Sequence, residues 1–407
     1  MSEKAITNVN IVTPVEVVEA GTLVIADGRI RAVEPERREA GSDVLDGGGR
    51  WLLPGFVDVH NDGMEQELEP RPRAVFPLAV AFRSMENRLV SHGITTIFHS
   101  FSFMDGREEI LAPDKLETAI RDIRHLTTFG AIRHLVHARY EIGEAQHYWR
   151  IQHLIKDGLV QLVSFMNHAP GQGQFRRIEN FIDYYKRKTG YSRQDLQRLM
   201  EERIQKSRSD VVMENVKRLA EDARSMGIPM ASHDDDSADK VAEMRELGVT
   251  IAEFPVVFDA AVAAASRGMH VVMGAPNVLR GKSNSGNLRA IDAIGAHAAH
   301  ALCSDYYTPS LLHAVFALFR GRTLALPRAA ALASLGPARA AGMEAEIGSI
   351  EVGKRADLIL VGEPGAVPSV NGAWVNGARV YEKADGAGAA AWADEIGAGR
   401  REAAYAP

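Results

Sequence analysis

Several features that mark whole classes of protein are scarce or missing in this chain of 407 residues. It has one cysteine, Cys303, which excludes an internal disulfide framework and fits a reducing cytoplasm. No apolar run approaches the roughly 18 residues of a membrane span. The opening residues, MSEKAITNVN, lack the basic and apolar parts of a secretory signal. We therefore expect a cytoplasmic protein with no membrane partner.

Positive charge is also in short supply. The chain has 47 Lys and Arg against 53 Asp and Glu, a formal net charge of -6. Surfaces that bind nucleic acid are normally basic, so we expect no nucleic-acid partner. A small phosphorylated ligand remains compatible with this balance, because a few local Arg and Lys residues are enough to bind one.

What the chain does have is the composition of a globular protein, with 46% hydrophobic and 25% charged residues. Its length suits one large α/β barrel or two ordinary domains. Residues 5–50 read as short β segments, and a similar signature returns in GSIEVGKRADLILVG (348–362). We predict a small β-sandwich domain built from residues 1–50 and 346–385, with a C-terminal tail of Ala and Gly over 386–407.

Residues 51–345 alternate apolar runs with amphipathic stretches, which is the βα pattern of a parallel sheet. Eight such parallel strands close into a TIM-like (β/α)8 barrel of the α/β class. A long polar insertion, roughly 170–220, is expected to form either a helical hairpin over the active-site face or a surface excursion. The eight runs are 54–60, 94–100, 132–141, 160–168, 228–234, 249–255, 270–277 and 300–305.

The first run, PGFVDVH, ends in His60 and is followed at once by Asn61 and Asp62. Alternate side chains of an extended segment share a face, so His60 and Asp62 can point at the same object. In a barrel they stand at the C-terminal mouth, where barrel enzymes keep their chemistry. The pair predicts a divalent metal site, and the alternative is a strand end with two solvated polar residues.

Other runs end in the same residue types, namely Glu141, His168, His233 and Asp305. Convergent imidazoles and carboxylates are what zinc requires, and carboxylates also admit manganese, iron or magnesium. Six ligands exceed the need of one ion, so we expect two ions bridged by Glu141 and a hydroxide. Each residue has a structural alternative, as His92, His99, His125 and His134 illustrate, and Asp234 to Asp236 are expected to form hydrogen bonds or face solvent.

A second cluster, MGAPNVLRGKSNSGN (273–287), combines Gly, Ser and Asn with two cations. Glycine lets backbone amides approach an anion, Arg and Lys neutralise it, and barrel enzymes often bind phosphate in the loops after the last two strands. The alternative is a flexible loop with no ligand. The residues predicted to bind an anionic substrate are Arg71, Arg73, Arg139, Asn277, Arg280, Lys282, Ser283 and Asn287.

These motifs resemble the amidohydrolase superfamily, in PGFVDVH, GSIEVGKRADLILVG and the late strand-end Asp305. Within it, HNDGMEQELEPRP, ARYE, FMNHAPGQ, SHDD, EFP, NVLRGKSNSGN and LCSDYY are similar to a branch of phosphonate-metabolism diphosphatases of the carbon–phosphorus lyase pathway. The resemblance implies release of pyrophosphate from α-D-ribose 1-methylphosphonate 5-triphosphate. Other enzymes of that pathway are then expected as partners, and a homodimer is the common default.

The chain also departs from the superfamily pattern. Asp62 stands where a second histidine is usual, and no strand-end lysine suggests a carbamylated bridge. The sixth run carries Glu253 where the superfamily usually has a histidine, so either His168 or Glu253 completes the site. Gly63 and Met64 also differ from the branch's usual residues, which puts the substrate more in doubt than the metal chemistry.

The expected mechanism is metal-assisted hydrolysis of a phosphoanhydride by a metal-bound hydroxide, with Asp305 taking the proton. Arg280, Lys282 and Arg71 are expected to stabilise the transferred phosphoryl group and the leaving pyrophosphate. The same metal site would serve an amidohydrolase that opens a C–N bond in a cyclic amide, an N-acyl amino acid or a deaminase substrate. A metal-binding scaffold without activity is the non-enzymatic alternative.

Overall fold

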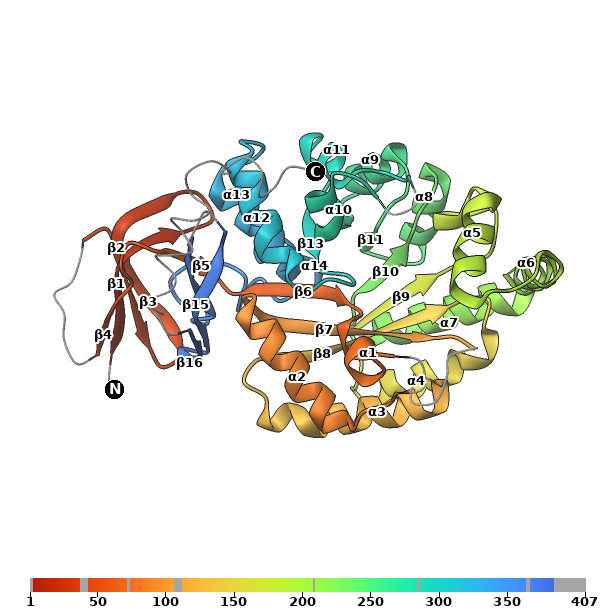
Figure 1. Ribbon diagram of the computed structural model, residues 1–407, viewed down its shortest axis with the longest axis horizontal. Helices are drawn as coiled ribbons and strands as arrows, with labels where there is room; N and C mark the ends of the chain where they lie inside the picture. Colours follow the sequence, from red (N-terminus) through yellow and green to blue (C-terminus); the bar gives the residue numbers. More distant parts are fainter. Residues whose placement is uncertain are drawn as a thin grey trace.

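A computed structural model gives the structure of the chain over residues 3–36, 43–71, 74–105, 112–207, 209–283, 286–363 and 367–383. The predicted tail over 386–407 and Arg73 lie outside these residues. Figure 1 shows two bodies, a small β structure made from both ends of the chain and a large barrel made from its middle. No helix in the described ranges is long and apolar enough to cross a membrane.

The barrel consists of eight parallel strands, hydrogen-bonded in the order in which they occur along the chain. Each of the eight predicted runs overlaps one of them, so the (β/α)8 prediction is confirmed. Strands such as β7 are buried along their whole length, which explains the near-continuous apolar runs of a parallel sheet covered on both faces. The strands are β6 (Phe56–Asn61), β7 (Ile94–Phe103), β8 (Arg133–Glu141), β9 (Leu162–Met166), β10 (Met230–His233), β11 (Ile251–Glu253), β12 (His270–Gly274) and β13 (Ala301–Cys303).

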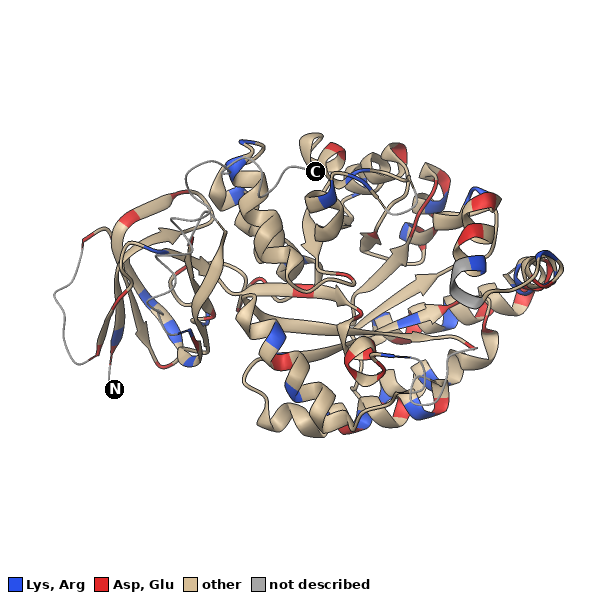
Figure 2. Cartoon of the chain, in the orientation of Figure 1, with Lys and Arg blue, Asp and Glu red and all other residues tan. Residues whose placement is uncertain are grey.

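Helices surround the strands (Figure 1), and charged residues of both signs are interspersed on them while the strands are mostly uncharged (Figure 2). Buried side chains of these helices and of the strands form one large apolar cluster. The helices are α1 (Gly63–Leu68), α2 (Leu78–Ser91), α3 (Pro113–Leu126), α4 (Tyr148–Lys156), α5 (Ile178–Thr189), α6 (Arg193–Ser207), α7 (Asp210–Ser225), α8 (Ala238–Glu246), α9 (Phe258–Ser266), α10 (Ala275–Arg280), α11 (Ala290–Gly295), α12 (Ser310–Arg320), α13 (Leu326–Ala333) and α14 (Leu335–Ala340). Short 3-10 turns are η2 (Thr127–Phe129), η3 (Ala145–His147) and η4 (Gly173–Phe175).

The two ends of the chain join in one mixed sheet, in the order β16-β15-β14-β5-β1-β2-β3, with β4 paired to β1. Strand β5 lies between the N-terminal strand β1 and the C-terminal strand β14, so each end of the chain completes the other. The strands are β1 (Lys4–Val12), β2 (Val17–Ala26), β3 (Arg29–Glu34), β4 (Val44–Asp46), β5 (Trp51–Pro54), β14 (Leu358–Gly362), β15 (Ser369–Val375) and β16 (Ala378–Glu382).

Two tight hairpin turns of this sheet pack against each other. Asp27-Gly28 joins β2 to β3 and Asn376-Gly377 joins β15 to β16, and all four residues have positive φ, as a two-residue turn of the I′ type requires. A Cβ on Gly28 would lie 2.7 Å from the carbonyl oxygen of Asn376. Glycine is therefore needed at Gly28 both for its backbone conformation and for the approach of the second turn.

Two loop predictions are resolved by the structure. The insertion after β9 forms a hairpin of α5 and α6, held by a small core of its own. The seventh run was expected to extend to residue 277, but β12 ends at Gly274 and α10 begins at Ala275. Pro276 in the first turn of α10 explains the switch, because its fixed φ suits a helix start and its missing N–H would weaken a strand.

Candidate metal centre and anion-binding cavity

The six predicted metal ligands lie at the carboxyl ends of their strands. Glu141 and His233 are the last residues of β8 and β10, and His60 is the last but one of β6. Asp62, His168 and Asp305 follow β6, β9 and β13 by one or two residues. Five of them take part in groups whose possible ligand atoms lie within 4.8 Å of one another. These groups are His60, Asp62 and Asp305; His168, His233 and Asp234; and His60, His233 and Glu253.

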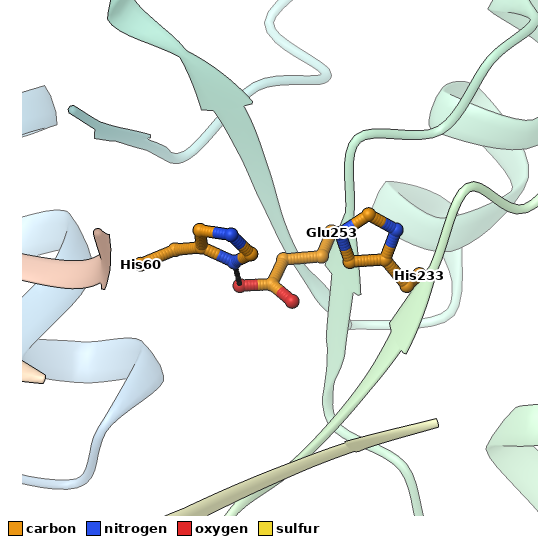
Figure 3. A group of neighbouring side chains, drawn as sticks. All are labelled: His60, His233 and Glu253. Carbon is orange, nitrogen blue, oxygen red and sulfur yellow. Dashed lines mark hydrogen bonds and ion pairs between the residues drawn. The ribbon is translucent and has the colours of Figure 1, made fainter. Parts of the chain in front are cut away.

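Glu253, the last residue of β11, lies close to both His60 and His233 at the mouth of the barrel. Its Oε1 lies 2.9 Å from Nδ1 of His60, and Figure 3 shows its carboxylate reaching His60 with His233 beside it. Sequence reasoning left His168 and Glu253 as alternatives, and the structure brings both to the mouth. Asp234 is 2.9 Å from Nδ1 of His233, as its expected hydrogen-bonding role requires.

Glu141 lies behind His168 rather than between the donor groups. Its Oε2 is 2.6 Å from Nδ1 of His168, and its Oε1 accepts a hydrogen bond from the backbone N–H of His168 at 3.1 Å. Carboxylates that hold the far nitrogen of an imidazole fix the ring and raise its basicity as a ligand. In this arrangement Glu141 contacts His168 and is not one of the grouped donors, and its predicted bridging role stays a prediction.

Arg139 brings a permanent positive charge to the floor of the mouth. Its guanidinium donates to Oδ1 of Asp62 at 2.8 Å and lies 3.4 Å from Nε2 of His233. Burial would lower the pKa of this group, but the carboxylates of Asp62 and Glu253 outweigh burial and raise it. Arg139 therefore stays charged within reach of anything bound at the mouth.

Burial and like charge shape the acidity of the site. Burial, reinforced by the neighbouring Asp62, raises the pKa of Asp305 to about 7. Burial also opposes the charge on Glu253, yet His60 and His137 hold the pKa of that carboxyl below its usual value. Asp62 and Asp305, whose oxygens lie within 4.8 Å of each other, repel one another, so a cation between them would be strongly favoured.

The residues present fit a divalent cation. One oxygen of Glu253, Oε2, is buried and has no hydrogen-bond partner among the described residues. An orphaned buried carboxylate oxygen is costly unless a cation or a donor satisfies it. Imidazole and carboxylate donors in this number match zinc, and also manganese or iron.

The backbone is strained at three positions that follow strands of the mouth. Asp234, Phe254 and Asp305 have φ of 59°, 54° and 56° without being glycine. For an aromatic residue this conformation is a genuine outlier, and the ring of Phe254 packs at 5.1 Å against both His60 and His233. Such strain persists where the surroundings hold a residue in place at a functional site. Here the strained backbone holds the Phe254 ring against both imidazoles.

The first and last strands of the barrel are joined by a polar clasp that sequence reasoning missed. Asp58 accepts hydrogen bonds from the backbone N–H and the hydroxyl of Ser304, at 3.0 and 2.5 Å. The side chain of Asn61 donates to the same hydroxyl at 2.5 Å. Beside the clasp the backbone of Asp305 bonds to that of His60 and Asp62. The alternation of Asp58 with His60 in PGFVDVH was the available signal, since such spacing puts both on one face.

A cavity of about 380 Å³ opens above the donor groups and has room for a small organic ligand. Helix α10 and the segment after it contribute five predicted substrate-binding residues to its lining, namely Asn277, Arg280, Lys282, Ser283 and Asn287. Arg139 also lines it, whereas Arg71 is exposed and is not one of the lining residues.

The lining residues from α10 and the segment after it differ in their hydrogen bonds and in their charge. Asn277 donates to the carbonyl of Leu288 and accepts from the N–H of Ala290, both at 3.0 Å, so it braces the loop. Ser283 accepts from the backbone N–H of Asn287 at 2.5 Å. The guanidinium of Arg280 lies 3.2 Å from the hydroxyl of Tyr306. Arg280 and Lys282 thus give the wall its positive charge.

Comparison with known proteins places the chain in one family. A family model described as "Amidohydrolase family" matches residues 51–381. The chain is 35% identical over 380 residues to the alpha-D-ribose 1-methylphosphonate 5-triphosphate diphosphatase of Escherichia coli (strain K12), which covers 92% of this chain and 100% of that protein. It is 26% identical over 399 residues to the imidazolonepropionase of Symbiobacterium thermophilum, covering 86% and 85% of the two chains.

Solved structures agree with this at the level of the fold. The 5-methylcytosine deaminase from Klebsiella pneumoniae matches with a TM-score of 0.63 at 14% identity, covering 93% of this chain and 98% of that one. The N-acetylglucosamine-6-phosphate deacetylase from Pasteurella multocida matches with a TM-score of 0.61, also at 14% identity, covering 92% and 99%. The predicted resemblance is confirmed, and this chain belongs to the amidohydrolase family of hydrolases.

Proposed function

We propose that the protein is a metal-dependent diphosphatase that converts α-D-ribose 1-methylphosphonate 5-triphosphate to the 5-phosphate and pyrophosphate. The proposal rests on one observation: the cavity has a group of metal donors at its floor and the cations Arg280 and Lys282 in its wall. The 35% identity to a diphosphatase of this name over its full length supports the choice of substrate.

We propose two divalent ions, with zinc favoured and manganese, iron or magnesium as alternatives. His60, Asp62 and Asp305 would hold one, and His168, His233 and Asp234 the other, with Glu253 between the two histidines. When bound, such ions lower the pKa of water and neutralise charge on a transferred phosphoryl group. Arg139 also contacts Asp62 and His233, so it would face the same phosphoryl oxygens.

Each side chain of the site then has its own role in the reaction. Water attacks the phosphorus next to the sugar 5-oxygen, the bond from that phosphorus to the bridging oxygen breaks, and pyrophosphate leaves. Asp305 takes the proton that the water loses, since its carboxylate lies beside His60 and Asp62. Arg280 and Lys282 bind the leaving pyrophosphate, and Arg139 stabilises charge on the phosphoryl group as it is transferred.

Product analysis tests this function. The purified protein, loaded with zinc or manganese, should release one pyrophosphate per molecule of the ribose triphosphate substrate. Release of ammonia or an amine from a cyclic amide, an N-acyl amino acid or a deaminase substrate, without pyrophosphate release, would assign the site to a C–N bond instead. The metal site alone cannot separate the alternatives because it would serve either reaction, whereas the released products differ.

The cellular setting follows from the same proposal. We place the enzyme in the cytoplasm, where the single buried thiol of Cys303 would stay reduced, and in sequence with other enzymes of the carbon–phosphorus lyase pathway. A homodimer is proposed as the default for such a chain. Light scattering of the purified protein tests the dimer, and a mass of 44.4 kDa would show a monomer.

A further inference from the structure

The insertion between β9 and β10 gives the cavity an aromatic wall. Phe175, Tyr184 and Tyr185 all line the cavity. Phe175 and Tyr185 belong to a small buried core with Phe181 and Leu196, which anchors α5 and α6 to each other. Tyr184 differs from Phe175 and Tyr185 in its exposure, because 47% of the residue is exposed while the other two are buried.

Tyr184 is held in place by its aromatic neighbours. Its ring centroid lies 5.5 Å from that of Phe175 and 5.1 Å from that of Tyr185. The guanidinium of Arg203, from α6, lies 4.9 Å above the ring of Tyr185. The aromatic neighbours therefore hold the Tyr184 ring at the cavity with part of its surface exposed, and a preordered ring loses little entropy when a ligand covers it.

The aromatic rings of the insertion and the cations Arg280 and Lys282 occupy different walls of the cavity. Helix α5 follows β9 and α10 follows β12, and two strands, β10 and β11, stand between them in the barrel. Donors of the proposed metal site, His233 and Glu253, end those two intervening strands. A ligand that reaches from α10 to α5 would therefore pass the metal donors, with Arg280 and Lys282 at one end and the rings of the insertion at the other.

We infer that Tyr184 is the surface on which the sugar ring of the substrate packs, and that it selects triphosphates bearing a ring over bare polyphosphate. The inference rests on the proposed function, because that function puts the scissile phosphorus over the metal donors and the pyrophosphate against Arg280 and Lys282. The ring-bearing end must then point the other way, towards α5. The apolar face of a sugar gains by covering an exposed aromatic ring.

Two substrates separate this role from a general one. With ribose 5-triphosphate, Tyr184→Ala is expected to lower kcat/KM about tenfold, chiefly through a higher KM. With inorganic tripolyphosphate, which has no ring, the same variant should keep the wild-type kcat/KM. Tyr184→Phe retains the ring and should restore most of the loss. An equal loss on both substrates, or no loss on either, overturns the inference.

A binding measurement keeps the test independent of turnover. Calorimetry with ribose 5-phosphate should show about tenfold weaker binding to Tyr184→Ala than to the wild type. Phe129→Ala removes another exposed ring, 66% exposed and not one of the cavity residues, and should bind like the wild type. If the wild type released no pyrophosphate, the proposed function would fail, while unchanged affinity in Tyr184→Ala would overturn the inference about Tyr184 itself.

Discussion

Two of the places where buried histidine and glutamate meet in the described part of this barrel differ in how well they suit a metal ion. At the mouth, His60 and His233 gather around Glu253 with further carboxylates beside them. Under α2, Glu86, His134 and His99 form a second cluster in the barrel wall. There Nε2 of His134 is 3.1 Å from Glu86 and its Nδ1 is 2.9 Å from Nε2 of His99.

In the wall cluster, defined as Glu86, His134 and His99, the carboxylate accepts hydrogen bonds and an imidazole is covered by an aromatic ring. Burial would raise the pKa of Glu86, but hydrogen bonds from His134 and from the N–H of Ala131 lower it. Burial holds the pKa of His99 well below its usual value, and the ring of Phe82 covers His134 at 4.4 Å. The wall cluster has one carboxylate, whereas the mouth has several facing a cavity. Convergence on a cavity, and not the number of histidines, distinguishes a metal site.

Removing the metal should have the largest effect and acts on the mouth alone. Dialysis against a chelator is expected to abolish pyrophosphate release, and zinc or manganese should restore it. Elemental analysis should find two ions per chain before treatment. One ion per chain would instead leave the second positive charge to Arg139, and full activity without metal would remove the mouth from the chemistry.

Asp305→Asn should come next, with turnover reduced about a thousandfold or more, since a positioned proton acceptor contributes this much. The amide has nearly the same shape, so the melting temperature should stay close to that of the wild type. Asp292→Asn, an exposed carboxylate paired with Arg289, serves as the control and should keep full turnover. Full activity in Asp305→Asn would exclude it as the proton acceptor.

Arg280→Ala is expected to raise KM for the triphosphate about tenfold to a hundredfold, with a smaller change in kcat, because it removes a charged contact to the phosphates. Added salt should weaken binding by the wild type more than by the variant. Arg218→Ala, on the exposed face of α7, is the matched control. Equal KM values for Arg280→Ala and the wild type would show that the anion binds elsewhere.

Glu86→Gln should have the smallest effect on activity, because it alters the wall cluster alone. The free energy of unfolding should fall by about 2 kcal/mol, the typical loss for hydrogen bonds to a buried charge, while metal content and kcat stay unchanged. The folded-state pKa of Glu86 is lowered, so its charge stabilises the fold above its unfolded pKa and this stabilisation is lost as pH falls through the folded pKa.

Denaturant titrations of the wild type and Glu86→Gln should therefore differ most near neutral pH and converge in acid. Loss of metal from Glu86→Gln would contradict the separation of the two clusters. A difference in stability that grew as the pH fell would contradict the assigned charge on Glu86.

Much of the fold could be predicted from the sequence because parallel barrel strands are buried on both faces. Each strand is then a short apolar run, and all eight were located. The ends of those runs located His60, His233 and Asp305, since a strand end is a local feature. The short β segments at the two ends of the chain were equally local features.

The parts that sequence reasoning missed depend on contacts between distant segments. The alternation of Asp58 with His60 says nothing of Ser304, 246 residues away. Glu141 ends its strand as a bridging ligand would, but its contact with His168 is set by the loop after β9. The role of Tyr184 depends on how α5 folds over the mouth. Strand patterns carry none of this information, because loops take their path from tertiary packing.

The clasp of Asp58 and Ser304 also has a consequence for how the protein is made. It joins β6, the first strand of the barrel, to β13, the last. During synthesis, at about 5–20 residues per second, the earliest donor, His60, would leave the ribosome many seconds before Asp305. Until then a nascent chain could not assemble the complete metal site. Completion of the donor set is thus a late event, because fragments ending before β13 would keep His168, His233 and Asp234 but lack the group of His60, Asp62 and Asp305.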